Sequence, residues 1–247
     1  FAANPADPVE GALVVAQIID HSAEVQWVKA ELDRLALEVG EGSAANICAT
    51  LRRLGFAGAR ESYYDLDNSR LDRVLRSKRG IPISLAVVLM GICQRLGTAA
   101  TGINFPRHFM LTIDEELVDP FAMGVTPWED ARRWVTQNNL RLEDAFNPAD
   151  AADIALRMLN NVRMILQSSG EHVRALEVSD YQLILVPENY GLYVERADVW
   201  MRLGDPEMVR QELRKALEFA PSQAIAERIA VRLNDVDGSG SSPSELN

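Results

Sequence analysis

A serine, a histidine and an aspartate follow one another at positions where they could carry out nucleophilic catalysis. Ser84 stands at the start of the most apolar run of the chain, His108 precedes the run "FMLTI", and Asp119 ends the run "ELVD". Backbone N–H groups at a helix N-terminus can stabilise an oxyanion, an imidazole can accept the hydroxyl proton, and a carboxylate can fix the imidazole tautomer. The candidate catalytic residues are therefore Ser84 as nucleophile, His108 as base and Asp119 as the group that orients the base.

The elements that must position these residues are a helix and a hairpin. We expect a buried helix over residues 84–96, followed by two short antiparallel strands, because "TGINF", "HFMLTI" and "LVDPF" are rich in β-branched and aromatic residues around the acidic turn "DEE". The 24 residues from Ser84 to His108 allow a helix and a turn, and the 11 from His108 to Asp119 allow a hairpin. This order and spacing are compatible with a single site.

Each of the three residues also has a purely structural interpretation. Ser84 can serve as the N-cap of its helix, a role that contributes about 1 kcal/mol, although Val87 at the third position excludes a capping box. His108 can hydrogen-bond Asp119 and hold the strands together, and an aspartate before Pro120 is common turn chemistry. The sequence favours this structural interpretation first, then a retained ligand pocket, then a working hydrolase.

Cysteine and histidine usage argues against a metal site and against a disulfide framework. Cys48 and Cys93 have no metal-ligand spacing and fit a reducing compartment, and the three histidines lack the spacing of a zinc site. The sequence shows no phosphate-binding loop or dinucleotide fingerprint, so we expect no cofactor. Cys93 follows Ser84 by nine residues, about half a turn out of phase on a helix, and is predicted to be a core residue.

The composition of the chain argues against two classes of partner. The formal net charge of -11 disfavours binding to nucleic acid or to anionic lipid. The longest apolar stretch, residues 81–93, is shorter than the roughly 18 residues of a membrane span, and the first residues, "FAANPADP", lack a signal-peptide pattern. We therefore expect neither nucleic acid nor a membrane as a partner, and a cytoplasmic location.

Helical periodicity dominates the chain on both sides of the predicted strands. Apolar residues recur at spacings of three and four from about residue 7 to residue 77, and helical sequence returns around residues 128–134. A basic stripe from Arg70 to Arg79 could contact an anion, a protein partner or DNA. A solvated helix face is the favoured interpretation of this stripe.

The last third of the chain contains an internal repeat. A spacing of 34 residues separates Gly170 from Gly204 and Pro187 from Pro221, and the pattern resembles tetratricopeptide repeats, which are pairs of helices. A capping helix is expected over residues 224–233. Because two repeats bury their own faces poorly, we expect them to pack on the rest of the chain.

Three motifs resemble the SirB family of bacterial proteins, which join a transglutaminase-like region to tetratricopeptide repeats. The motifs are "NSRLDRVLRSKRGIPISLAVVLMGICQRLG", "GINFPRHFMLTI" and "LVDPFAMG", and the resemblance runs from about residue 55 to residue 221. It implies a papain-like core with a Cys, His and Asp catalytic triad. The family's Cys position falls on Ser84, its His position on His108 and its Asp position on Asp119.

The serine at the family's cysteine position argues against the family's chemistry. A thiol of pKa about 8.5 is readily held as a thiolate beside a protonated imidazole, whereas a hydroxyl must lose its proton during attack to a base already aligned with it. The shorter bond to oxygen also leaves the nucleophile out of reach in a site laid out for sulfur. A displacement of about 1 Å can lower a rate roughly 100-fold.

These patterns predict an α+β, mostly helical protein with a papain-like or transglutaminase-like core and C-terminal tetratricopeptide-like repeats. The expected domains are residues 1–148, with the core at about 55–148, the repeats at 149–235, and a disordered Gly- and Ser-rich tail at 236–247. The expected function is an interaction module that binds a protein or peptide on the repeat groove. The alternative is a Ser-His-Asp hydrolase or acyltransferase acting on amide or ester bonds, and the oligomeric state is left open.

Overall fold

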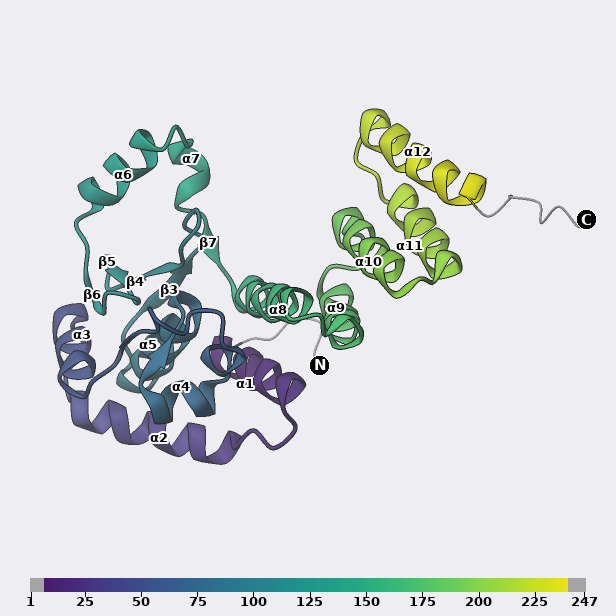
Figure 1. Ribbon diagram of the computed structural model, residues 1–247. Coiled ribbons are helices and arrows are strands. Elements are labelled where there is room, and N and C mark those ends of the chain that lie inside the picture. Colours follow the sequence, from purple (N-terminus) through teal and green to yellow (C-terminus); the bar gives the residue numbers. More distant parts are fainter. Residues whose placement is uncertain (1–6, 240–247) are drawn as a thin grey trace, which may run out of the picture. The chain divides into compact units, whose positions relative to one another are not determined.

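The computed structural model describes residues 7–239 and divides the chain into two compact units, Phe1–Ile165 and Leu166–Asn247 (Figure 1). The repeat pattern predicts a domain boundary after residue 148, whereas residues 149–165 belong to the first unit. Helix α8 (Ala151–Ser168) carries most of this segment. Its Ile154 packs on strand β3 so closely that a Cβ added at Gly102 would lie 3.2 Å from Ile154 Cδ1.

The helices of the first unit gather around one central helix, α5 (Pro82–Leu96). Helices α1 (Pro8–Ile19), α2 (Val25–Val39) and α4 (Leu71–Ser77) all contact α5. Helix α3 (Ala44–Arg53) and the 3-10 helix η1 (Leu66–Ser69) complete this layer. The helices expected from the apolar periodicity of residues 7–77 are therefore present.

Helix α5 is buried along most of its length. It begins at Pro82, two residues before the expected start, because the fixed φ of proline suits the first helical position. It ends at Leu96 and is capped by Gly97, whose φ of +69° is the left-handed conformation common at helix ends. Gly91 lets two neighbouring helices approach, since a Cβ there would lie 2.9 Å from Val9 and 3.1 Å from Leu32.

A five-stranded antiparallel sheet contacts α5 and has the strand order β6-β5-β4-β3-β7. Its strands are β3 (Ala100–Ile103), β4 (Met110–Ile113), β5 (Glu116–Asp119), β6 (Gly124–Val125) and β7 (Pro148–Ala149). The prediction of two strands was wrong, partly because two-residue strands such as β6 and β7 show no recognisable alternation. A separate parallel pair joins β1 (Ala57–Gly58) to β2 (Arg79–Gly80).

Helices α6 (Trp128–Gln137) and α7 (Leu142–Ala145) form a smaller core against the sheet. In this core the ring of Phe105 lies 5.2 Å from that of Trp134 and 5.5 Å from that of Phe146. Helix α6 agrees with the helical pattern expected around residues 128–134. Because Phe105 is anchored in this core, the loop that leads to His108 has a fixed starting point.

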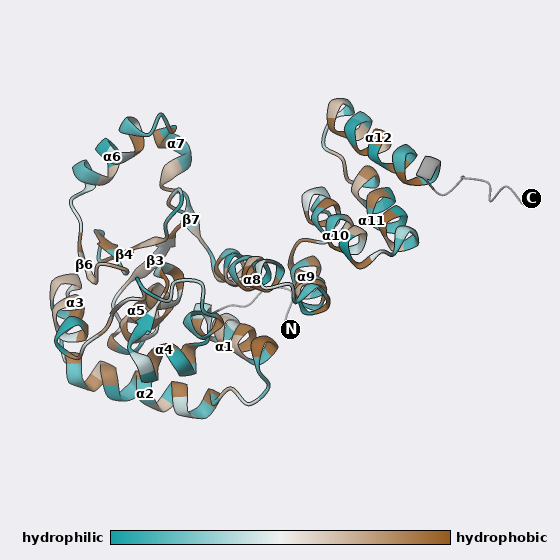
Figure 2. Ribbon diagram, viewed as in Figure 1, coloured by the Kyte–Doolittle hydropathy of each residue, from teal (hydrophilic) through white to brown (hydrophobic). Residues whose placement is uncertain are grey.

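The second unit consists of helices. These are α9 (His172–Leu185), α10 (Tyr190–Leu203), α11 (Pro206–Glu218) and α12 (Gln223–Ser239), with α10 packed on α11 and α11 on α12. Helix α12 carries interspersed polar and apolar residues (Figure 2). Its Ile229 is buried in the core of this unit. The expected capping helix is therefore longer than predicted. Residues 236–239, assigned to a disordered tail, are helical, and residues 240–247 lie outside the described part of the chain.

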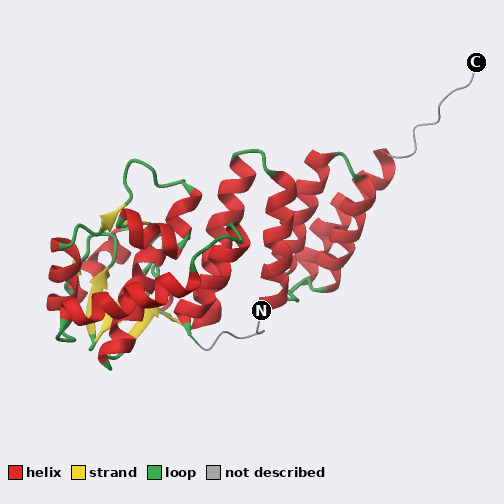
Figure 3. Cartoon of the chain, turned by 90° about the horizontal axis from the view of Figure 1, so that it is seen from below, coloured by secondary structure: helices red, strands yellow, loops and turns green. Residues whose placement is uncertain are grey.

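Helices make up most of the described residues, and the strands occupy one small region of the first unit, as expected for a mostly helical α+β protein (Figure 3). None of the helices within residues 7–239 combines the length and the apolar character needed to cross a membrane.

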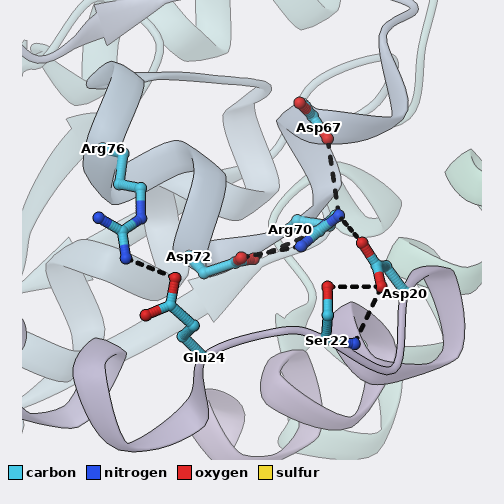
Figure 4. A network of polar contacts seen from close by, with 7 residues as sticks. All are labelled: Asp20, Ser22, Glu24, Asp67, Arg70, Asp72 and Arg76. Carbon is cyan, nitrogen blue, oxygen red and sulfur yellow. Dashed lines mark hydrogen bonds and ion pairs between the residues drawn. The ribbon is translucent and has the colours of Figure 1, made fainter.

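Arg70 lies at the centre of an ion-pair network (Figure 4). It is the buried member of the basic stripe, whereas Arg73, Arg76 and Arg79 are exposed, as the interpretation of a solvated face predicts. Its side chain is 5% exposed and donates to Asp72 at 2.9 Å and to Asp20 at 2.6 Å. Arg76 pairs with Glu24 at 2.6 Å at the more exposed end of the same network. These two arginines join helix α4 to the loop between α1 and α2, which carries Asp20 and Glu24.

Candidate functional site

The structure brings His108 and Asp119 together. His108 Nε2 lies 2.9 Å from Asp119 Oδ1. His108 comes two residues before β4 and Asp119 ends β5, and these strands pair in antiparallel register with Leu111 opposite Val118. Because the start of one antiparallel strand and the end of its neighbour share an edge of the sheet, the hairpin places the imidazole beside the carboxylate.

Asp119 is held by two backbone groups as well as by the imidazole. Its Oδ1 accepts hydrogen bonds from the N–H groups of Phe121 at 2.8 Å and Ala122 at 3.1 Å, as in an Asx turn. Burial acts to raise the pKa of Asp119, but the hydrogen bond and charge of His108 and the two N–H groups lower it below its ordinary value. The carboxylate is therefore ionised at neutral pH and can fix the orientation of the ring.

The turn that carries His108 has an unusual backbone. His108 N–H donates to the carbonyl of Phe105 at 3.1 Å, and Arg107, inside this turn, has a φ of +60°. A side chain in the left-handed region is uncommon outside Gly and Asn, and it costs roughly 1 kcal/mol or more. The side chain of Arg107 stands at this strained position.

Arg157 of helix α8 braces the same turn from behind. Its guanidinium donates to the carbonyl of His108 at 2.5 Å, to that of Phe105 at 3.4 Å and to Asn104 Oδ1 at 3.2 Å. Burial lowers the pKa of Arg157. All of these partners are neutral oxygens, and within residues 7–239 no carboxylate pairs with this arginine.

The structure does not join Ser84 to the other two candidate residues. Its side chain is fully buried, and its hydroxyl accepts from the N–H of Ile81 and donates to the carbonyl of Ile81, both at 3.1 Å. Ile81 occupies the N-cap position and Ser84 is the third residue of α5, so the expectation that Ser84 is the N-cap was wrong. The Ser84 hydroxyl accepts the N–H of the N-cap residue Ile81, as the third helical residue does in a capping box. Ser84 thus lies three residues after the N-cap position and does not occupy it.

A pocket of about 400 Å³ opens beside His108 and Asp119. It is lined by Phe105, Pro106, Arg107, His108, Met110, Asp119, Thr126, Asp130, Ala131 and Trp134. Ser84 is absent from this lining. Apart from His108 and Asp119, none of these residues is predicted from the sequence to be functional, although the apolar neighbours in "FPRHFM" indicate an apolar surface around His108.

A second group of side chains surrounds Phe121, two residues after Asp119. The ring of Phe121 lies 6.3 Å from the imidazole of His108 and 6.1 Å from the ring of Tyr63, and Arg60 stands 5.4 Å from its centre. Gly58 of strand β1 makes this approach possible, because a Cβ there would lie 2.4 Å from the Phe121 ring. Strand β1 thereby brings the loop with Arg60 and Tyr63 to the ring of Phe121, which in turn contacts His108.

The two cysteines lie outside the site. Both are buried, and burial raises the pKa of Cys48 to about 11 and that of Cys93 to about 12, so neither is a thiolate at neutral pH. Cys93 has the predicted core position in α5. In residues 7–239, no three or more His, Cys, Asp or Glu side chains form a group that could hold a metal ion.

Comparison with known proteins identifies the family of the chain. The transglutaminase-like superfamily matches residues 26–160, more than half of the chain. A UPF0162 protein of Xylella fastidiosa (strain 9a5c) is 29% identical, over 86% of this chain and 79% of that protein. The UPF0162 protein YchA of Escherichia coli (strain K12) is 25% identical, over 96% of this chain and 95% of that protein.

One relative carries the family name that the motifs suggested. Protein SirB1 of Salmonella typhimurium is 23% identical, and the match covers 96% of this chain and 95% of that protein. No solved structure matches the chain. The residues of the His108 and Asp119 site lie inside the region that the superfamily matches. The chain therefore belongs to the transglutaminase-like superfamily and, within it, to the SirB/UPF0162 family.

Proposed function

We propose that this protein binds a protein segment and does not hydrolyse amide or ester bonds. The observation that carries the proposal is the environment of Ser84, which is fully buried and makes both hydrogen bonds of its hydroxyl to Ile81. A serine nucleophile has to contact its general base and face the substrate. The bonds to Ile81 instead support a structural role, in which the serine stabilises the first turn of α5.

The replacement of the family's cysteine supports the same proposal. A thiolate can form beside an imidazolium before the substrate arrives, whereas a hydroxyl depends on a base within hydrogen-bond distance. His108 Nδ1, the ring nitrogen that faces away from Asp119, makes no hydrogen bond to Ser84 or to any other group in the described part of the chain. We therefore regard the transglutaminase-like core as a scaffold without its ancestral activity.

A groove on the second unit supports a position for the partner. It encloses about 400 Å³ between α10 and α12 and is lined by Tyr190, Val194, Ile225, Arg228, Ile229, Val231 and Arg232. Val231 is 59% exposed, although its side chain is apolar. Arg232 pairs with Asp198, whereas exposed Arg228 makes no ion pair within residues 7–239. The groove thus combines an apolar floor with an uncompensated positive charge.

This chemistry fits an amphipathic segment with acidic side chains. Apolar side chains of such a segment would contact Val194, Ile225 and Val231, and an acidic side chain would pair with Arg228. The 34-residue spacing and the paired helices α10 and α11 support assigning this unit to tetratricopeptide-like repeats, whose helices form grooves for such segments. We propose that the second unit provides the partner site of the protein.

A peptide display library of acidic amphipathic sequences, panned on the full-length protein, tests this proposal. Selected peptides are expected to bind the Arg228→Glu variant about tenfold more weakly than the wild type, because the charge at the groove is reversed. Arg214→Glu is the matched control, since Arg214 is an exposed arginine of α11 outside the groove. It should bind the peptides as the wild type does, and so should Ser84→Ala. Isothermal titration calorimetry measures each affinity.

Three outcomes contradict the proposal. The first is that panning yields no peptide that binds, and the second is that the selected peptides bind Arg228→Glu and Arg214→Glu equally well. The third is that Ser84→Ala alone abolishes binding while its unfolding midpoint remains close to that of the wild type.

A hydrolase or acyltransferase is the second candidate, because the hydrogen-bonded His108 and Asp119 pair opens onto a pocket. A fluorophosphonate reagent, which labels activated serines, separates the two functions. We expect Ser84 to stay unlabelled in the folded protein. Labelling of Ser84 that disappears in His108→Ala would establish the hydrolase instead. A Ser84→Cys variant is a second test, since rapid alkylation at neutral pH would reveal a thiolate beside the imidazole.

The state of the two cysteines supports a proposed location in the cytoplasm. Cys48 and Cys93 are both free and buried, and neither takes part in a disulfide. Free thiols are typical of proteins in reducing compartments.

A further inference from the structure

The pocket beside His108 has the dimensions and lining of a small-molecule site. Its volume of about 400 Å³ falls within the usual range of ligand pockets, roughly 300–1,000 Å³. Phe105, Met110 and Trp134 give it apolar walls, and they belong to the compact core formed by the sheet and α6. The walls are therefore rigid, and they suit a large apolar or aromatic group.

The pocket is lined by two carboxylates, Asp119 and Asp130, which both have partners, and by one arginine that has none within residues 7–239. Asp119 is hydrogen-bonded to His108 at 2.9 Å, and Asp130 pairs with Arg133 at 3.0 Å. Arg107 also lines the pocket, yet this exposed arginine has no ion-pair partner in the described part of the chain. In a chain of net charge -11, an arginine at a pocket without a carboxylate partner is an available site for an anion.

The backbone at Arg107 gives an independent reason to assign it a ligand. Its φ of +60° is a conformation in which glycine would be more stable. Side chains in such conformations are concentrated at functional sites, where the surrounding structure holds them in place. Arg157 supplies that support here, since it donates to the carbonyls of Phe105 and His108 on either side of the strained residue.

We propose that this pocket binds a carboxylate that carries a large apolar group, with the carboxylate on Arg107 and the apolar group against Met110 and Trp134. Such a group occurs at the C-terminus of a peptide that ends in an aromatic residue, and also in a free aromatic acid. The site lies in the first unit and does not depend on the groove of the second unit. It is a binding site beside His108 and requires no reaction at Ser84.

Titration of the full-length protein with N-acetylphenylalanine tests the proposal. The acid is expected to shift the amide resonances of residues that line the pocket. N-acetylphenylalaninamide, which has the same ring and no charge, should bind about five- to tenfold more weakly, because the charge-assisted hydrogen bonds to Arg107 are lost. 3-Phenylpropanoate then distinguishes the two sources of the ligand. Tighter binding of N-acetylphenylalanine than of 3-phenylpropanoate indicates a peptide C-terminus, and the reverse indicates a free acid.

The variant Arg107→Gly separates binding from folding. Glycine relieves the left-handed backbone, so the thermal unfolding midpoint should stay the same or rise, while the affinity for N-acetylphenylalanine falls about five- to tenfold. Glu115→Gly is the matched control, because Glu115 also has a positive φ, +71°, and lies in the turn between β4 and β5 at the other end of these strands. This control should bind the acid like the wild type.

Several results would overturn the proposal. One is the absence of resonance shifts at millimolar concentrations of the acid, and another is equal affinity for the acid and the amide. A third is an Arg107→Gly variant that is folded and retains the affinity of the wild type.

Discussion

Arg70 and Arg157 both support the fold of the first unit, but their partners are of different kinds. Arg70 is buried and donates to the carboxylates of Asp72 and Asp20. Arg157 is partly buried and donates to three neutral oxygens of the segment that carries His108. Carboxylates therefore offset the charge of Arg70, whereas the hydrogen-bond partners of Arg157 are neutral and leave its charge in place.

The pKa values of the two guanidinium groups show the same contrast. Burial acts to lower the pKa of Arg70, but the hydrogen bonds and charges of Asp72 and Asp20 raise it above its ordinary value. Burial lowers the pKa of Arg157 as well, and the nearby Tyr63 offsets this only in part. Arg157 therefore brings a guanidinium to the segment that carries His108 without an ion-pair partner of its own among the described residues, whereas the charge of Arg70 is offset by its carboxylate partners.

The largest expected effect comes from removing one carboxylate from the ion-pair network of Arg70. Asp72→Asn removes one charge from a pair whose side chains are 5% and 4% exposed, and the half-exposed Asp20 remains as the close carboxylate partner of the buried Arg70. We expect a loss of about 3–5 kcal/mol in the free energy of unfolding, measured by urea denaturation. Glu24→Gln, in the exposed pair with Arg76, is the control and should cost less than about 1 kcal/mol. Equal losses in the two variants would contradict the importance of burial.

Arg157→Met should have an intermediate effect on stability. It removes hydrogen bonds to three neutral oxygens, which remain partly accessible to water, so we expect a loss of about 2 kcal/mol in the free energy of unfolding. The turn around Arg107 also loses its brace, so backbone relaxation at residues 105–108 should report greater mobility. Arg157→Lys keeps the charge but loses the planar guanidinium, so its free energy of unfolding should lie between those of the wild type and Arg157→Met. If Arg157→Met lowered the free energy of unfolding as much as Asp72→Asn does, hydrogen bonds to neutral oxygens would matter as much here as buried ion pairs, which contradicts the comparison.

Contacts within one hairpin could be predicted from the sequence, whereas contacts between elements far apart in the chain could not. His108 and Asp119 are 11 residues apart on a hairpin, so their pairing followed from strand patterns. Arg157 is 49 residues from His108, and no periodicity links a residue of α8 to a turn before β4. Arg107 gave no signal either, because its positive φ contradicts the preference of arginine and is imposed by the fold around it.

The position of Ser84 shows a different limit. The rule for proline at the first helical turn would have started α5 at Pro82, which moves Ser84 from the N-cap to the third helical position. Even then, the partner of the serine could not be read from residue types, because Ser84 bonds the backbone of Ile81, whose side chain is apolar. The family resemblance identified the position in the fold but not the contacts of the residue that occupies it.

Ser84→Ala should have a smaller effect than the arginine variants. It leaves the buried N–H and carbonyl of Ile81 without the serine, and a neutral hydrogen bond contributes about 1 kcal/mol. We expect a loss of about that size in urea denaturation, with no change in the affinity for N-acetylphenylalanine. A much larger loss of stability would contradict the small structural role assigned to Ser84. A loss of affinity in a protein of unchanged stability would show that Ser84 acts at the pocket beside His108.

The smallest expected effect concerns Asp119, the carboxylate that is hydrogen-bonded to His108. Folding lowers the pKa of Asp119 below the ordinary value of 3.8, since the hydrogen bonds and charge from His108 and the backbone outweigh burial. A depressed pKa in the folded state contributes stability above the unfolded pKa, and this contribution is lost as pH falls through the folded pKa. The stability advantage of the wild type over Asp119→Asn should therefore be constant near neutrality and shrink below about pH 4. Urea denaturation of both proteins from pH 7 to pH 2.5 measures it, and an advantage that grows on acidification would mean that burial, and not His108, controls this carboxylate.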